Sequence, residues 1–181
     1  TQLFAAGVPS KCVGIGETGL DFHYDFSERS SQIHAFEEQL QFAKQYDLPV
    51  VIHCREAFAD LFASIKKIGL SSRGSVMHCF TGTAPDAKAA LDLGLKISFS
   101  GILTFKNADA LRDAAKSIPL SEVVLETDCP YLSPIPYRGK RGEPWMIEAT
   151  AAEIAELRGI ALSEVLTATT QNAKRLFTKI S

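Results

Sequence analysis

Residues 49–69 read PVVIHCREAFADLFASIKKIG and contain one complete strand–helix unit. The first six, Pro49–Cys54, are largely apolar on both faces, which is typical of a parallel strand that is covered on both sides. A helical stripe follows, whose apolar members recur every three or four residues: Phe58, Leu61, Phe62, Ile65 and Ile68. Gly69 stands where helix C-termini favour glycine. This stretch therefore predicts a β-strand followed by an amphipathic helix.

The same strand–helix pattern recurs along the whole chain. Further strands are predicted at 11–16, 74–79, 95–100 and 122–127, each rich in Val, Ile, Leu or Phe and bounded by turn residues. Further helices are predicted from Ser27 to about 46, from Thr83 to 94, from Asn107 to just before 119, from Pro144 to about 159, and in two short pieces from Ser163 and over 170–177. Repeated units of this kind predict an α/β fold with a parallel sheet.

The length of the chain limits which α/β architecture fits. The 181 residues predict a single domain over 1–181. An open doubly wound sheet and a closed (β/α)8 barrel are both built from such units. A barrel typically needs about 250 residues, or about 31 for each unit. Five strands do not fill a barrel, so the periodicity leaves both architectures open.

Composition and charge exclude several classes of protein. Hydrophobic residues make up 46% of the chain and charged residues 22%, as in an ordinary globular protein. The formal net charge of −2 provides no broad basic face for non-specific nucleic-acid binding. Four scattered cysteines favour a reducing compartment, and hence a cytoplasmic location. Apolar runs such as 48–52 are too short to span a membrane, and Thr1–Pro9 lack the pattern of a signal peptide.

Ionisable side chains recur where the predicted strands end. They are Glu17, His53, Arg55, His78, Glu126 and Asp128. The carboxyl ends of parallel strands meet at one rim, which is where α/β folds bind ligands. Carboxylates and imidazoles suit a divalent metal ion in hydrolysis, although a structural polar rim is the competing interpretation. Strand alternation turns the neighbouring cysteines away from this rim, so they are interpreted as small buried hydrophobes.

Other polar and aromatic residues carry weaker signals. His34 lies on the polar side of a predicted helix and is interpreted as solvated, whereas His23 could line the site or simply lie in a loop. The basic loop 137–142 is either a phosphate-contacting lid or a solvated loop. Four aromatic residues near strand ends could stack on bases or belong to the core: Phe80, Phe99, Phe105 and Tyr131. For Phe99 the core is favoured.

Several motifs, taken in order, resemble the TatD family of metal-dependent deoxyribonucleases. They are Gly16-Glu17-Thr18-Gly19-Leu20-Asp21, Val51-Ile52-His53-Cys54-Arg55, His78-Cys79-Phe80-Thr81-Gly82, Ile97-Ser98-Phe99-Ser100-Gly101 and Glu126-Thr127-Asp128-Cys129-Pro130-Tyr131-Leu132. The tail 169–177 also looks like the last helix of that family. No single motif is sufficient, but the ordered set is highly specific and covers nearly the whole chain.

The resemblance implies a TIM-type (β/α)8 barrel that binds divalent metal ions at its carboxyl rim, two in each intact site. Glu17 matches the bridging carboxylate of the family, and His53 and His78 match two histidine ligands. Asp128 matches an aspartate that binds metal and can accept a proton from the attacking water. Further matches, Arg55 and Arg138, are basic positions that would face a substrate phosphate. Gly142 stands where many relatives carry Asn, and Cys129 where many carry Ser.

One departure from the family is large. Its first strand carries a His-x-His pair and a later one a Gly-x-His-Pro turn, and this sequence contains neither. The resemblance therefore implies the carboxyl-terminal two-thirds of a TatD-like barrel, with about five of the eight strand–helix units. The expected function is metal-dependent cleavage of phosphodiester bonds of DNA at ends or single strands, by exonuclease action, with Mg, Mn and Zn not distinguished. No membrane or protein partner is expected. The alternatives are hydrolysis of amides, esters or small phosphoesters, or an inactive truncated metal-binding fragment.

Overall fold

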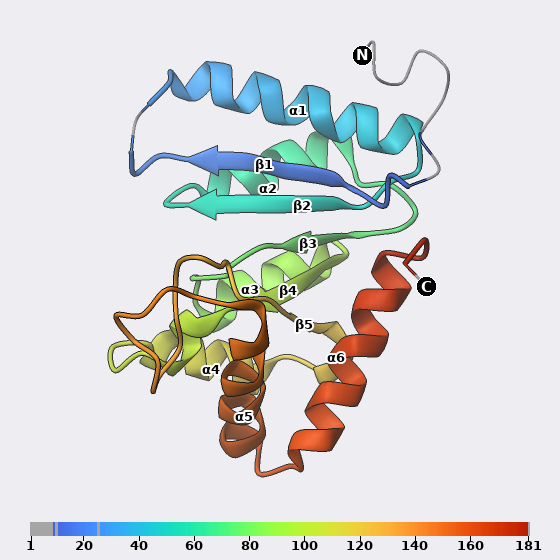
Figure 1. Ribbon diagram of the computed structural model, residues 1–181. Coiled ribbons are helices and arrows are strands. Elements are labelled where there is room, and N and C mark those ends of the chain that lie inside the picture. Colours follow the sequence, from blue (N-terminus) through green and yellow to red (C-terminus); the bar gives the residue numbers. More distant parts are fainter. Residues whose placement is uncertain (1–8, 10, 25, 181) are drawn as a thin grey trace. The chain divides into compact units, whose positions relative to one another are not determined.

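The computed structural model describes residues 9, 11–24 and 26–180, so most of the segment Thr1–Pro9 lies outside the described residues. Five strands alternate with helices along the chain (Figure 1). The strands are β1 (Ile15–Asp21), β2 (Val50–Arg55), β3 (Ser75–Met77), β4 (Leu95–Phe99) and β5 (Val123–Leu125). The helices are α1 (Arg29–Gln45), α2 (Phe58–Ile68), α3 (Ala84–Asp92), α4 (Asp109–Ser117), α5 (Ile147–Arg158) and α6 (Leu162–Leu176), with short 3-10 turns η2 (Gly101–Thr104), η3 (Leu120–Glu122) and η4 (Pro144–Met146). The predicted α/β class is confirmed.

The chain divides into two compact units. Unit 1 comprises residues 1–76 and 174–181, and unit 2 comprises residues 77–173. In unit 1, β1 and β2 are parallel neighbours, and α1 and α2 pack against each other and against these strands (Figure 1). The buried side of α1 is formed by Phe36, Leu40 and Ala43, which recur at helical spacing. The described part of the chain contains no helix that is long and apolar enough to cross a membrane.

Strand β1 differs from its prediction. It runs from Ile15 to Asp21, whereas the sequence predicts a strand over 11–16, so Glu17 lies within the strand and not after it. The physical reason is that the glycines of β1 lie inside the strand. Gly19 has φ +152°, and a Cβ atom there would lie 1.9 Å from the carbonyl oxygen of His53. Glycine therefore does not end this strand but allows its backbone to approach β2 closely.

Unit 2 contains β4 and β5 as parallel neighbours, with Ile97 beside Val123 and Phe99 beside Leu125. Thr83 begins α3 with a reciprocal capping box to Asp86, as its position in the sequence predicts. The helices α3, α4 and α5 pack in succession and cover this part of the sheet (Figure 1). The predicted strands 49–54, 74–79, 95–100 and 122–127 are all present; β2 is shifted by one residue, β4 is one residue shorter, and β3 and β5 are each three residues shorter.

The core of unit 2 settles the roles of two aromatic residues. Phe80 and Phe99 are 2% and 0% exposed and pack edge to face, with ring centroids 6.3 Å apart. The core interpretation of Phe99 is therefore confirmed, and base stacking by Phe80 is excluded. Phe105 is half-buried beneath the guanidinium of Arg138, while Tyr131 is exposed.

Helix ends account for the remaining differences. Ser27 does not cap α1, which begins at Arg29; instead, the carbonyl of Ser27 accepts a hydrogen bond from Gln32 Nε2. Asn107 likewise does not cap α4, whose N-cap is Ala108. The two short helices predicted near the carboxyl end are one helix, α6. Thr169 hydroxyl donates to the carbonyl of Val165 within it, so the polar stretch of this segment does not interrupt the helix.

Candidate metal centre

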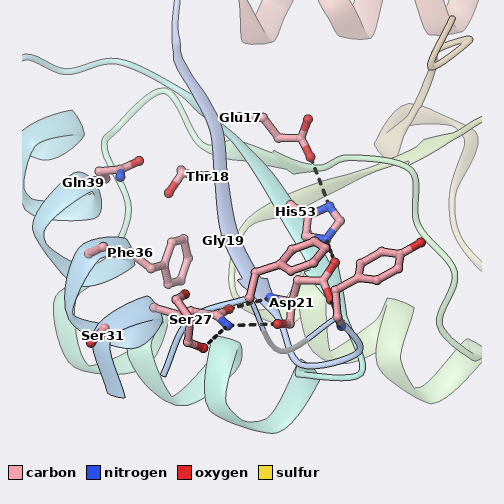
Figure 2. A pocket seen from close by; sticks show the side chains of 13 residues that line it. Glu17, Thr18, Gly19, Asp21, Ser27, Ser31, Phe36, Gln39 and His53 are labelled. Carbon is pink, nitrogen blue, oxygen red and sulfur yellow. Dashed lines mark hydrogen bonds and ion pairs between the residues drawn. The ribbon is translucent and has the colours of Figure 1, made fainter. Parts of the chain in front are cut away.

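The side chain of His53 lies between two carboxylates of β1 (Figure 2). Its Nδ1 atom is 3.0 Å from Oε1 of Glu17, and its Nε2 atom is 3.1 Å from Oδ2 of Asp21. The parallel register places His53 beside Gly19, so that Glu17 and Asp21 flank it along the strand. Both carboxylates point to the same side because they are four residues apart in a strand, where side chains alternate with a period of two.

Asp21 is the more firmly held of these two carboxylates. Its Oδ1 accepts hydrogen bonds from the backbone N–H groups of His23 and Tyr24, at 3.0 and 3.1 Å. Burial by itself raises the pKa of Asp21, but these backbone donors and the ring of His53 outweigh burial and leave the pKa below its ordinary value. The side chain of Gln32 accepts a hydrogen bond from the backbone N–H of Asp21 and donates one to its carbonyl. An ionised Asp21 in this position accepts the Nε2–H of His53 and directs Nδ1 toward Glu17.

Unit 2 contains a second histidine between two carboxylates, with the roles of its two ring nitrogens exchanged. Nδ1 of His78 lies 3.0 Å from each oxygen of Glu126, with the hydrogen bond made to Oε2. Nε2 of His78 faces Oδ1 of Asp128 at 3.8 Å. Ser98 on β4 donates a 2.6 Å hydrogen bond to Oε2 of Glu126 and so fixes that carboxylate. Glu126 and Asp128 follow β5 on either side of Thr127, which places both carboxylates beside the ring of His78.

We call Glu17, Asp21 and His53 the first cluster and His78, Glu126 and Asp128 the second cluster. In each cluster one carboxylate is suited to orienting the ring and the other to binding a metal ion. The side chain of Asp21 is 26% exposed against 49% for Glu17, and that of Glu126 is 19% exposed against 32% for Asp128. A less exposed carboxylate behind the ring sets the histidine tautomer, as outer partners of metal-binding histidines do.

The donor atoms on the other side of each ring fit a divalent cation. Two ligands at about 2.1 Å from one ion lie roughly 3–4 Å from each other. The Glu17–His53 and His78–Asp128 separations of 3.0 and 3.8 Å fall in this range. Oε1 of Glu126 is buried and receives no hydrogen bond from any described residue, although it lies 3.0 Å from Nδ1 of His78. Each cluster therefore offers an imidazole nitrogen and a carboxylate oxygen to a cation.

A pocket of unit 1 opens beside the first cluster. It has a volume of about 640 Å³, and Glu17, Asp21 and His53 form part of its lining (Figure 2). The remaining walls come from the loop after β1 and from one side of α1, and they include Ser31, Phe36 and Gln39, among others. The carboxylates and imidazole of the first cluster are thus accessible to a ligand of moderate size.

The other predicted site residues are placed as follows. Arg55 ends β2, and its guanidinium lies 4.6 Å above the ring of Tyr24. Arg138 is exposed and lies 3.8 Å above Phe105. His34 is exposed on α1, as predicted, and His23 is bonded to Glu56 at 2.7 Å.

The expectation for the cysteines holds only in part. Cys54 is buried, but Cys129 is exposed because it follows the end of β5 and is not part of it.

Two carboxylates have roles that the sequence does not predict: Asp21, and Glu126 as an orienting group. Both could have been found from their spacing: Asp21 lies four residues after Glu17 in one strand, and Glu126 lies two residues before Asp128. These intervals place pairs of carboxylates on one side of an extended chain. The spacing does not tell which member of each pair orients the ring and which faces the metal ion.

Comparisons with known proteins agree with this chemistry. The family model for TatD related DNase matches residues 2–178. The metal-dependent hydrolase YabD of Bacillus subtilis, itself uncharacterized, is 44% identical over 167 residues, which are 92% of this chain and 66% of YabD. A 3′-5′ ssDNA/RNA exonuclease, TatD of Erwinia tasmaniensis, is 40% identical over 171 residues, covering 91% of this chain and 66% of that protein.

A solved structure gives the same result for the fold. The crystal structure of YjjV, a TatD homologue from Escherichia coli, superposes with a TM-score of 0.86 at 34% identity, over 92% of this chain and 64% of that one. The chain thus spans about two thirds of the length of the relatives that it matches. The predicted barrel-type α/β fold with five strand–helix units is confirmed. With its family model matched over almost its entire length, the chain belongs to the TatD family.

Proposed function

We propose that this protein is a divalent-metal-dependent hydrolase that cleaves phosphodiester bonds of DNA as an exonuclease. The observation that carries the proposal is the arrangement around His53 and His78, each with an orienting carboxylate behind one nitrogen and a second carboxylate facing the other. The exonuclease named in Erwinia tasmaniensis supports the choice of a nucleic acid over other phosphoesters. DNA ends or single strands, in the cytoplasm, are the proposed substrate and setting.

Four side chains would hold the metal ions: Glu17, His53, His78 and Asp128. Glu17, His53 and His78 each offer one ligand atom of a type that a divalent cation accepts. In the intact site we assign two ions, and Glu17 would contribute to holding both; Mg²⁺, Mn²⁺ and Zn²⁺ are the candidates. When bound, such ions lower the pKa of water and offset the negative charge that develops on the phosphate.

The protein's own groups would carry the remaining steps. Asp128 accepts the proton of the attacking water, since its carboxylate faces His78 at the more exposed end of the second cluster. Asp21 and Glu126 hold the two imidazoles in one tautomer. Arg55 and Arg138 offset the charge of the substrate phosphate, for which a guanidinium offers two parallel N–H donors.

The test is an activity assay with a matched pair of variants. The protein is incubated with Mg²⁺, Mn²⁺ or Zn²⁺ and either single-stranded DNA labelled at one end or a panel of small amides, esters and phosphoesters. We expect stepwise shortening of the DNA and little turnover of the small substrates. Asp128→Asn should lower the rate by about 10²-fold or more, the low end of a general-base contribution. His34→Ala, on the exposed side of α1, should leave the rate unchanged.

Different outcomes would contradict different parts of the proposal. Turnover of amides or esters with no loss of DNA would replace the nuclease by a carbonyl hydrolase. Metal binding without hydrolysis of any substrate would identify an inactive metal-binding chain. Equal losses in Asp128→Asn and His34→Ala would show that the site assignment is wrong.

A further inference from the structure

Two aromatic rings of unit 1 are exposed beside the first cluster. Tyr24 and Phe26 follow β1, and they are 52% and 89% exposed. Their rings are stacked, with centroids 5.3 Å apart and planes only 5° from parallel. A phenylalanine with nearly all of its surface in water gains little from the core, so a parallel exposed pair points to a function in binding.

The positively charged side chain of Arg55 lies against one ring of this pair. The guanidinium of Arg55 is 4.6 Å from the centroid of the Tyr24 ring, and His23 packs edge-on against the same ring at 4.9 Å. A positive charge near a π-face, together with free aromatic surface, is the combination with which proteins bind the bases and backbone of single-stranded nucleic acids.

The loop that carries the rings is anchored to the residue that orients His53. Both the N–H of Tyr24 and that of His23 donate to Asp21 Oδ1, whose partner oxygen bonds His53 Nε2. His23 is also bonded to Glu56 at 2.7 Å, which ties the loop to the end of β2. The position of the Tyr24 ring is therefore fixed relative to the candidate metal ligands, and little ordering would be needed when a ligand binds.

Both rings line the same 640 Å³ pocket as Glu17, Asp21 and His53. If a metal ion held a substrate phosphate near Glu17 and His53, the base of that nucleotide could occupy this pocket beside the rings. We propose that Tyr24 and Phe26 form a stacking platform for a nucleobase of a single-stranded substrate, with Arg55 supporting the platform. The proposal rests on the proposed nuclease function and adds the surface that selects a base-bearing strand.

The experiment separates base stacking from phosphate binding. Fluorescence anisotropy is measured with single-stranded oligothymidylate and with an oligomer of the same length whose terminal nucleotides are abasic, both with Mn²⁺ and in the Asp128→Asn background to prevent cleavage. Phe26→Ala should weaken binding of the oligothymidylate by about 5-fold or more and leave the abasic oligomer unaffected. Phe26→Trp and Tyr24→Phe keep a π-face and should retain affinity.

Steady-state kinetics provide a second readout in the otherwise unaltered protein. Phe26→Ala should raise KM for oligothymidylate with little change in kcat, because the ring binds ground state and transition state alike. Leu162→Ala, which removes another exposed apolar side chain in unit 2, is the matched control and should change neither.

Three results would overturn the platform. Equal weakening for the intact and abasic oligomers would mean that the rings act only through the position of Asp21. Unchanged binding by Phe26→Ala, in a protein that still degrades DNA, would refute the platform and leave the nuclease proposal intact. A wild-type protein that neither binds nor cleaves nucleic acid would refute both proposals.

Discussion

Nδ1 of His78 is held 3.0 Å from the carboxylate of Glu126, and this contact decides which nitrogen of the ring is available for a metal ion. Glu126 is itself fixed by Ser98, so the ring is positioned through two successive hydrogen bonds. Asp21 and His53 form a related contact in unit 1, but there the nitrogen that faces the less exposed carboxylate is Nε2. His53 in β2 and His78 directly after β3 thus each have a less exposed carboxylate partner, which a purely structural polar rim does not require.

Removing the charge of Glu126 should weaken metal binding without removing a ligand. Glu126→Gln keeps the size of the side chain but lowers the basicity of His78, and outer-partner changes of this kind cost about 10- to 100-fold in metal affinity. Calorimetric titration with Zn²⁺ or Mn²⁺ measures the effect. Glu122→Gln is the matched control, because Glu122 precedes β5, at the opposite end of that strand from Glu126, and pairs with Lys96 at 3.0 Å. Equal affinities in the wild type and Glu126→Gln would remove the orienting role.

Residues 1–181 alone should bind one divalent ion tightly. The proposed ligands Glu17, His53, His78 and Asp128 would suffice for one ion, whereas a second would lack the His-x-His pair that the resemblance implies and the sequence does not contain. Calorimetry gives the stoichiometry, and nuclease activity of this chain alone should be weak. A metal concentration of a hundred times Kd should stabilise the fold by about 2.7 kcal/mol, and EDTA should reverse the rise in Tm. Two tight sites with full turnover would show that further ligands complete the centre.

Core and platform phenylalanines should differ sharply in their effect on stability. Phe99→Ala removes a fully buried ring that packs on Phe80 and should lower the free energy of unfolding by about 3–5 kcal/mol. Phe26→Ala removes a ring that is 89% exposed and should change it by less than about 0.5 kcal/mol. Urea denaturation followed by circular dichroism compares the two. A large loss for Phe26→Ala would mean that its ring has a structural role.

The stability contribution of Asp47 should depend on pH. Its carboxylate accepts hydrogen bonds from the hydroxyl and N–H of Ser72 and from Nε of Arg73. The hydroxyl of Ser72, and to a lesser degree Arg73, lower the pKa of Asp47 despite the opposing effect of desolvation. A lowered folded-state pKa means that this contribution is complete above the ordinary pKa of the carboxyl and is lost as pH falls through the folded-state value.

Asp47→Asn tests this pH dependence with little strain, because asparagine tolerates the positive φ of 48° at this position. Thermal melts should show a lower Tm for the variant than for the wild type at neutral pH. The difference in Tm should be smaller at about pH 3, which lies below the ordinary pKa of an Asp carboxyl. A difference that stayed constant across this range would mean that the charge of Asp47 contributes nothing.

The alternation of strands and helices follows from local sequence. Apolar runs such as 50–54 and helical stripes such as that of α2 depend on residues within one element, and strand ends are where parallel folds place ligands. Glu17, His53, His78 and Asp128 could therefore be predicted as ligands, together with the chemistry that such residues support. The length of β1 could not be predicted, because Gly16 and Gly19 are typical of strand ends in sequence and are required inside this strand only because β2 packs closely against them.

Only the tertiary structure decided how the side chains are paired. The contacts of His53 with Asp21 and of His78 with Glu126 join residues 32 and 48 positions apart, and they depend on strand register, which periodicity within one strand does not contain. Exposure is decided in the same way: Phe80 and Phe26 are the same residue type, yet one is 2% and the other 89% exposed. What covers a side chain is set by distant segments, so its role in the core or in binding emerges only when the chain is folded.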